Sequence, residues 1–248
     1  VIGLGLELLV LGLDALLDLF IGLLRVLPLD LARPAIGREL LGPRVLTSSP
    51  ERNMRDMWRH FAAEFICTFA LVFVGSAAIM ATRLSGTSEV LIAAALAHGL
   101  ILAIMVTATM RISGHLNPAI TLGFLAARRI EPLMGGIYVC AQILGAIAAA
   151  YVLKATLPAD LFAATRGGGQ AISLDVTTGQ AFWLEAIATF FLTFVVFATA
   201  VDPDAPRVGG FAIGLTYGAN ILAIGSFTGG SMNPARSLAP AIVSGHLE

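Results

Sequence analysis

Long apolar runs constrain this chain more than any other feature of its sequence. Five of them are about 20 residues long, the length that a helix needs to cross the hydrocarbon core of a bilayer. They are Phe61–Ala81, Val90–Met110, Leu133–Leu153, Gln180–Val201 and Gly209–Phe227. Charged residues, prolines or glycines bound each run. We therefore expect an all-α protein embedded in a membrane.

The composition supports this fold class and excludes several functions. Of 248 residues, 57% are hydrophobic and 12% are charged, whereas a soluble domain carries about 25% charged residues. The net charge of −1 provides no basic surface for nucleic acid. Cys67 and Cys140 lie inside apolar runs, which favours small core residues over a disulfide or a metal site. We expect no metal, no cofactor and no nucleic-acid partner.

Two further apolar stretches, Ala119–Ala127 and Ala235–Val243, are too short to cross a membrane. Each begins at the same tripeptide, and the two copies are Asn117-Pro118-Ala119 and Asn233-Pro234-Ala235. Short apolar segments at corresponding places in two halves of a membrane chain indicate re-entrant half-helices around a pore.

The two halves of the chain can be aligned. Glu64-x-x-x-Thr-Phe-x-Leu-x-Phe73 matches Glu185-x-x-x-Thr-Phe-x-Leu-x-Phe194, and Gly114–Ala119 matches Gly230–Ala235. Each repeat should hold three spans and one half-helix, so the second copy lies inverted in the membrane. The counterpart of the span that begins at Leu133 would start one position beyond Glu248. We therefore expect the sixth span to be missing from this chain.

The paired Asn-Pro-Ala motifs have a direct physical interpretation. Proline suits the first position of a helix, and the preceding asparagine can cap that helix. Two such helix starts facing each other bring two positive dipole ends to the middle of the membrane, which opposes cations. A water molecule between the asparagines accepts hydrogen bonds from both. A single Asn-Pro would more often be a turn, but two matched copies make a turn improbable.

The segments Ser113–Gly123 and Gly229–Ala241 resemble those of the aquaporin, or major intrinsic protein, family. The resemblance runs from about Arg59 to His246 and includes the membrane glutamates and Gln142-x-x-Gly-Ala146. It implies an inverted-repeat helical bundle with one pore per protomer, assembled as a homotetramer. It also implies passive transport without catalysis.

Charged residues inside a bilayer are costly and are therefore candidates for functional sites. Glu64 and Glu185 are two such residues. The resemblance implies that they accept hydrogen bonds from the re-entrant loops instead of taking part in transport, and that Gln142 lines the pore or holds a loop.

Arg236 follows the second Asn-Pro-Ala motif directly, where the first half has Ile120. The resemblance places it in a selectivity filter with His98, Ile221 and Gly230, although a lone histidine in an apolar run is more often a packed core residue. In this filter, His98 is expected to supply one polar contact to the solute.

The combination of filter residues resembles some tonoplast-type aquaporins, which are associated with water and ammonia. Glycerol facilitators normally carry Asp after the filter arginine, and Ser237 at this position argues against glycerol.

The segment before the first span matches nothing in the family. Val1–Leu27 is rich in leucine, and its charges fall on one stripe of a helix that would be interfacial or embedded in the membrane. No methionine precedes Met54. We expect residues 1–53 to be an extra segment of uncertain status and residues 54–248 to be a channel domain truncated before its sixth span. A permuted chain, in which Val1–Leu27 replaces the sixth helix, is the alternative.

The sequence thus predicts a passive transmembrane channel for water, with ammonia or another small neutral solute as a further substrate. Two alternatives are a transporter with alternating access and a non-conducting structural protein of the same fold.

Fourteen arginines against one lysine are typical of a GC-rich bacterial gene and indicate a bacterial plasma membrane. Basic residues near the span ends place the start of the first span and the loop Asp202–Arg207 in the cytoplasm.

Overall fold

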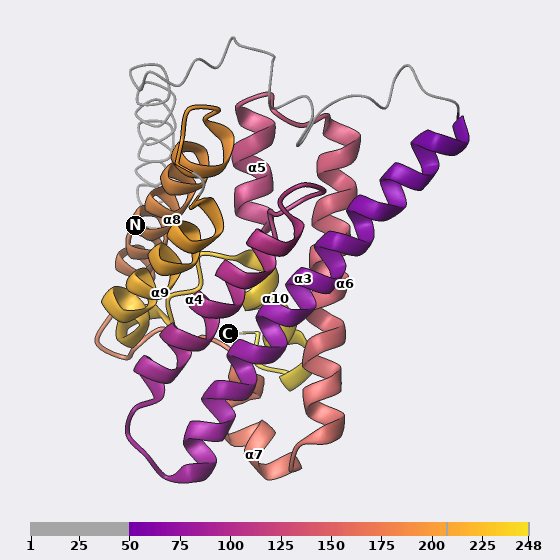
Figure 1. Cartoon of the computed structure of the whole chain (residues 1–248). Coiled ribbons are helices and arrows are strands. Elements are labelled where there is room, and N and C mark those ends of the chain that lie inside the picture. The colour runs from indigo at the N-terminus through magenta and orange to yellow at the C-terminus, as the bar shows by residue number, and fades with distance from the viewer. Residues whose placement is uncertain (1–49, 207, 248) are drawn as a thin grey trace, which may run out of the picture. The chain divides into compact units, whose positions relative to one another are not determined.

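A computed structural model describes residues 50–206 and 208–247, which fold into helices joined by loops (Figure 1). They belong to one compact unit of the chain, Ala35–Glu248. Apart from the first turn of the first described helix, the segment 1–53 lies outside the described residues.

Five helices among the described residues are long and apolar enough to cross a membrane, which confirms the five predicted spans. They are α3 (Pro50–Ser85), α4 (Val90–Thr109), α6 (Pro132–Thr156), α8 (Thr178–Val196) and α9 (Gly209–Thr228). A short π-helix, η2 (Phe197–Val201), continues α8. Helix α3 begins well before the expected Phe61, because its first turns are polar and an apolar pattern cannot detect them.

Two shorter helices begin at the Asn-Pro-Ala motifs, as predicted. Helix α5 (Pro118–Ala126) has nine residues and α10 (Pro234–Ser244) has eleven. At about 1.5 Å per residue, each reaches about halfway through a hydrocarbon core of about 30 Å. Helix α7 (Ala159–Ala164) and the single 3₁₀ turn η1 (Arg166–Gly168) lie in the loop after α6.

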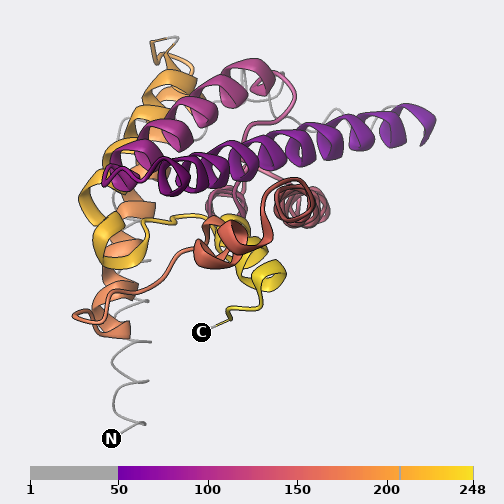
Figure 2. The ribbon, with the colours of Figure 1, turned by 90° about the horizontal axis from the view of Figure 1, so that it is seen from below.

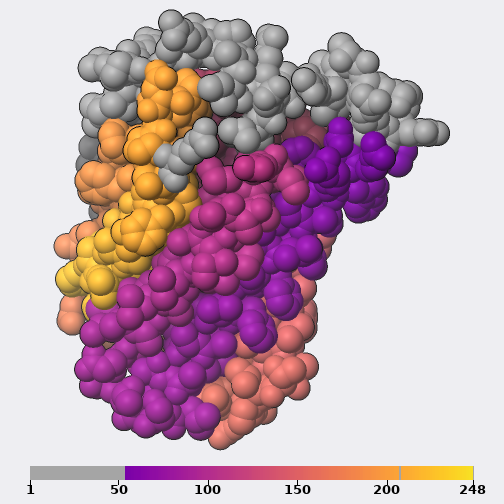
Figure 3. Space-filling view, viewed as in Figure 1, coloured from indigo at the N-terminus to yellow at the C-terminus, as the bar shows by residue number. Residues whose placement is uncertain are grey.

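The long helices pack in two groups that correspond to the two halves of the sequence. Helix α3 contacts α4 and α6, whereas α8 contacts α9. The groups meet where α4 lies against α9, and Figure 3 shows α4 between α3 and α9. The second half-helix, α10, packs against α6 of the first group (Figure 2). Among the described residues, α6 has no counterpart after α10.

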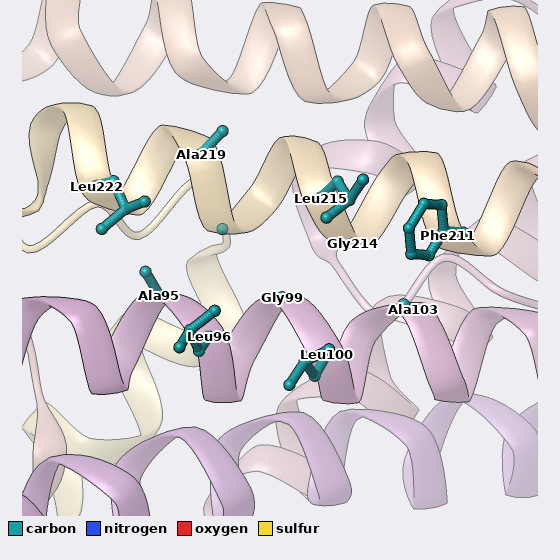
Figure 4. A pocket seen from close by; sticks show the side chains of 11 residues that line it. Ala95, Leu96, Gly99, Leu100, Ala103, Phe211, Gly214, Leu215, Ala219 and Leu222 are labelled. Carbon is teal, nitrogen blue, oxygen red and sulfur yellow. The ribbon is translucent and has the colours of Figure 1, made fainter.

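Glycines allow α4 and α9 to approach closely. A Cβ atom added to Gly99 would lie 2.8 Å from the carbonyl oxygen of Gly214, and one added to Gly214 would lie 2.3 Å from that of Gly99. Small residues commonly mediate such helix contacts in membranes, where close packing replaces the hydrophobic effect. Beside this contact runs an apolar groove, lined by side chains such as Leu96, Leu100 and Phe211 (Figure 4).

The cysteines have different environments. Cys67 is buried, as expected of a small core residue, but Cys140 is exposed on α6. The prediction for Cys140 was therefore wrong, because an apolar run in a membrane helix includes residues that face outward as well as inward.

Candidate functional site

The two half-helices begin in the same way. Asn117 and Asn233 lie in extended backbone just before a proline at the first helical position. The side-chain oxygen Oδ1 of Asn117 accepts from the backbone N–H of Ala119 at 2.8 Å. In the second half, Oδ1 of Asn233 accepts from the N–H of Ala235 at 3.0 Å. Each asparagine is therefore a helix cap, and its amide nitrogen is free for another contact.

The amide nitrogens connect the two loops across the centre of the bundle. Asn117 Nδ2 donates to the carbonyl of Met232 at 2.7 Å, and Asn233 Nδ2 donates to the carbonyl of Leu116 at 2.9 Å. Leu116 and Met232 have φ of +53° and +50°, which is uncommon for large side chains. An amide carries two N–H groups, so each asparagine keeps one more donor beside a small cavity that both of them line.

Glu64 fastens the first re-entrant loop to α3. Its Oε1 accepts from the hydroxyl of Ser113 and from the backbone N–H of His115 at 2.9 Å. Its Oε2 accepts from the N–H of Leu116 at 2.8 Å and from Gln142 Nε2 at 2.7 Å. The side chain has no exposed surface. All four donors belong to the loop or to α6, so the carboxylate holds the loop in place.

Glu185 does the same for the second loop with a smaller set of partners. Its Oε1 accepts from Thr228 Oγ1 at 2.6 Å and from the N–H of Ser231 at 2.8 Å. Its Oε2 accepts from the N–H of Met232 at 2.7 Å. Within the described part of the chain, no side-chain amide donates to Glu185 as that of Gln142 does to Glu64. Glu185 is only half-buried. Each carboxylate thus accepts hydrogen bonds from two successive backbone N–H groups of its re-entrant loop.

The structure brings together the four residues expected to form the filter. Arg236 Nε donates to His98 Nε2 at 2.8 Å, and Arg236 Nη1 donates to the carbonyl of Gly230 at 2.8 Å. Gly230 lies against Ile221, since a Cβ on this glycine would be 3.1 Å from Ile221 Cα. Arg236, His98 and Ile221 are at most 2% exposed.

The role expected of His98 differs from its contacts. Its Nδ1 lies 2.8 Å from the carbonyl of Ala94, an acceptor, so Nδ1 carries the hydrogen. Its Nε2 then accepts from Arg236. Both ring nitrogens are engaged, and His98 positions the guanidinium instead of offering a free polar contact. The remaining N–H groups of Arg236 are the donors left among the four residues of the expected filter.

Sequence reasoning missed His115, the residue two positions before the first motif asparagine. It is 5% exposed, its Nε2 has no hydrogen-bond partner among the residues that the structure describes, and it lines the same cavity as Asn117 and Asn233. A polar side chain in a re-entrant loop, where the matching position of the second half holds Ser231, is the signal that could have found it.

The geometry of two capped half-helices and a buried arginine agrees with comparisons to known proteins. A family model described as "Major intrinsic protein" matches residues 51–248. Aquaporin TIP4-4 of Zea mays is 44% identical over 196 residues, which cover 75% of this chain and 76% of that protein. Aquaporin NIP6-1 of Arabidopsis thaliana is 39% identical over 82% of this chain and 65% of its own length.

A solved structure has a similar fold. The aquaglyceroporin from Plasmodium falciparum is 25% identical, with a TM-score of 0.65 over 76% of this chain and 81% of that one. The capped Asn-Pro-Ala helices, the family match and the relatives agree: this chain belongs to the major intrinsic protein family and is a passive membrane channel for water and small neutral solutes, not an enzyme.

Proposed function

We propose that the channel conducts water and neutral ammonia in single file past Asn117 and Asn233, and that His98, Ile221, Gly230 and Arg236 set its selectivity. The observation that carries this proposal is the pair of asparagines. Each one caps a half-helix and donates one hydrogen bond to the opposite loop, which leaves one N–H donor for a passing molecule. The names of the relatives, which are aquaporins of the TIP and NIP types, support it.

The asparagine pair explains why protons would not follow water. A water molecule that accepts from Asn117 and from Asn233 has its oxygen engaged by the protein, so its hydrogens point away along the file. It cannot also accept from the next water, and the chain of hydrogen bonds that a proton needs is interrupted. The helix N-termini behind both asparagines add a positive potential that opposes any cation.

The filter supports ammonia as a second substrate. Arg236 keeps its charge, because a guanidinium does not lose its proton in proteins, so ammonium is repelled. Ile221 adds no donor and Gly230 adds no side chain, which leaves this side of the opening wide and apolar. Ser237 contacts Ser231 and supplies no carboxylate of the kind found after the arginine of glycerol facilitators.

Two other mechanisms are less well supported. A transporter with alternating access usually needs a coupling-ion site, but both intramembrane glutamates already accept hydrogen bonds from the loops. A closed, structural protein has no need of a buried arginine that is positioned by two partners.

Stopped-flow shrinkage of proteoliposomes separates these mechanisms. A channel gives a fast water flux that does not saturate and that has a low activation energy. A carrier saturates, and a structural protein gives the rate of empty liposomes. Either of the last two results would refute the proposal.

The assembly and location of the chain are parts of the same proposal. We propose a homotetramer, in keeping with the resemblance, since the outer faces of α4 and α9 carry exposed apolar side chains on both sides of their groove (Figure 4). The protein is integral to a membrane, and its arginine-rich composition favours a bacterial plasma membrane, although aquaporins TIP4-4 and NIP6-1 are plant proteins. Residues 54–248 would form the channel domain and residues 1–53 an additional segment.

A further inference from the structure

A tyrosine on α9 lies between the proposed filter and the asparagine pair. Tyr217 precedes Ile221 by four positions, so both side chains lie on the same face of α9. Tyr217 lines the cavity that Asn117 and Asn233 also line, and this cavity has room for about one water molecule. The tyrosine side chain is fully buried. Its ring is therefore part of the wall of the proposed pathway.

Hydrogen bonds along the second re-entrant loop give Tyr217 a defined position. The carbonyl of Gly230 accepts from Arg236 Nη1 at 2.8 Å, in the proposed filter. The carbonyl of Met232 accepts from the asparagine of the first motif at 2.7 Å. Between these two residues, the carbonyl of Ser231 accepts from the hydroxyl of Tyr217 at 2.7 Å. Three successive residues of one loop thus contact the filter, Tyr217 and the asparagine pair, in that order.

The ring of Tyr217 also lies close to the charged side of the proposed filter. Cζ of Arg236 is 6.0 Å from the centroid of the ring, within the range of a cation–π contact. The centroid of the His98 ring is 6.3 Å from the same point. Because these three side chains are at most 2% exposed, little space remains among them. A molecule that moves between Arg236 and the asparagine pair must therefore pass the Tyr217 ring.

Tyr217 contributes bulk to the pathway more than it contributes polarity. The one hydrogen of its hydroxyl is donated to Ser231, and this bond fixes the end of the ring to the loop. Other side chains around the cavity, such as Leu71 and Val106, are apolar. A molecule wider than water would have to displace the ring, which would break the bond to Ser231 and disturb the close packing of a fully buried side chain.

We propose that Tyr217 is a specificity-determining residue whose ring forms a second constriction, between the filter and the asparagine pair. The constriction admits water and ammonia and excludes larger neutral solutes such as urea and glycerol. This inference rests on the proposed function, since it requires that molecules pass through the cavity. It adds a division of roles: the charge of Arg236 repels cations, whereas the bulk of Tyr217 limits the size of neutral solutes.

The test measures the permeability of proteoliposomes that contain the full chain to water, urea and glycerol. Tyr217→Val removes the ring, whereas Tyr217→Phe keeps the ring and loses the bond to Ser231. We expect Tyr217→Val to pass urea and glycerol several-fold faster than wild type, and Tyr217→Phe to exclude both as wild type does. The matched control is Tyr151→Val, at an exposed position of α6 that does not line the cavity. It should leave the solute profile unchanged.

A further variant keeps the test valid if valine prevents folding. Tyr217→Leu fills more of the space than valine and should change the solute profile in the same direction, to a smaller extent. All permeabilities are compared per folded and reconstituted protomer, so that a loss of protein is not counted as a change in selectivity.

The outcomes separate the two proposals. If neither wild type nor any Tyr217 variant conducts water faster than empty liposomes, the proposed function fails. If wild type conducts water and the Val and Leu variants still exclude urea and glycerol, the second constriction does not exist. Rapid passage of these solutes through wild type would also overturn it. Equal passage through Tyr217→Phe and Tyr217→Val would do the same, because the hydroxyl and not the ring would then set the limit.

Discussion

Arg236 and His98 share a hydrogen bond of 2.8 Å that joins the second half-helix to α4, a helix of the first repeat. The bond fixes the guanidinium on one side, and the carbonyl of Gly230 fixes it on another at 2.8 Å. The positive charge of Arg236 thus has a defined position. Because His98 is held in turn by the carbonyl of Ala94, the arginine depends on the geometry of α4.

The first prediction tests this dependence. His98→Leu removes the acceptor of Arg236 Nε and leaves a buried charged donor without a partner, which costs about 1–3 kcal/mol. Chemical unfolding in detergent micelles should show that the free energy of unfolding falls by this amount. The substitution Ile104→Ala, at an exposed position on the same helix and outside the α4–α9 groove, serves as a control and should have a smaller effect. Equal stability of His98→Leu and wild type would mean that the bond contributes nothing.

A glycine on α3 makes room for His98. A Cβ atom on Gly75 would lie 2.0 Å from His98 Nε2, which is the atom that accepts from Arg236. Gly75→Ala should therefore displace the ring, break its bond to Arg236 and lower both stability and water flux. The matched control is Gly136→Ala on α6, where no atom lies within 4 Å of the added methyl group. It should be neutral or slightly stabilising, because alanine favours a helix by about 0.5–1 kcal/mol over glycine. Similar effects of the two substitutions would refute the argument.

The two glutamates should differ in their contribution to stability. A glutamine at either position replaces one acceptor oxygen by an NH₂ group that faces a backbone N–H, so a charge-assisted bond worth about 1.5–3 kcal/mol is lost. Glu64→Gln should cost more than Glu185→Gln, because Glu64 is fully buried with four donors whereas Glu185 is half-buried with three. Thermal unfolding of the two variants provides the comparison, and the reverse order would be inconsistent with a purely structural role.

Orientation in the membrane can be tested at the loop between α8 and α9. The basic residues near the span ends, such as Arg55 and Arg128, predict that the start of α3 and this loop face the cytoplasm. A protease site inserted after Asp204 should be resistant in intact cells and cleaved in inverted vesicles. Cleavage from outside intact cells would show that the assignment is wrong.

Much of this fold could be predicted from the sequence because its strongest signals are local. Apolar length marks the spans, and an asparagine before a proline marks where α5 and α10 begin. The repeat of Glu64 at Glu185 correctly related the two halves. The contacts of His98 could not be predicted, since its partner lies 138 positions away and nothing in either local sequence indicates which ring nitrogen accepts. His115 was missed although it is a polar side chain in a re-entrant loop, because the cavity that it shares with Asn117 and Asn233 appears only in three dimensions.

The last prediction concerns the choice between water and ammonia. His98→Phe removes the acceptor of Arg236 Nε, and Ile221→His places a polar ring against Gly230, on the side of the proposed filter that has only apolar side chains. The double variant should therefore have a narrower and more polar opening, which lowers ammonia flux several-fold while water still passes. Ammonia-driven alkalinisation of vesicles, measured beside osmotic shrinkage of the same preparation, gives both rates. His98→Phe alone is the control, since it frees the arginine without narrowing the Ile221 side. Equal ammonia rates in wild type and the double variant would show that these positions do not set selectivity, and the channel would then be one for water whose filter lies elsewhere.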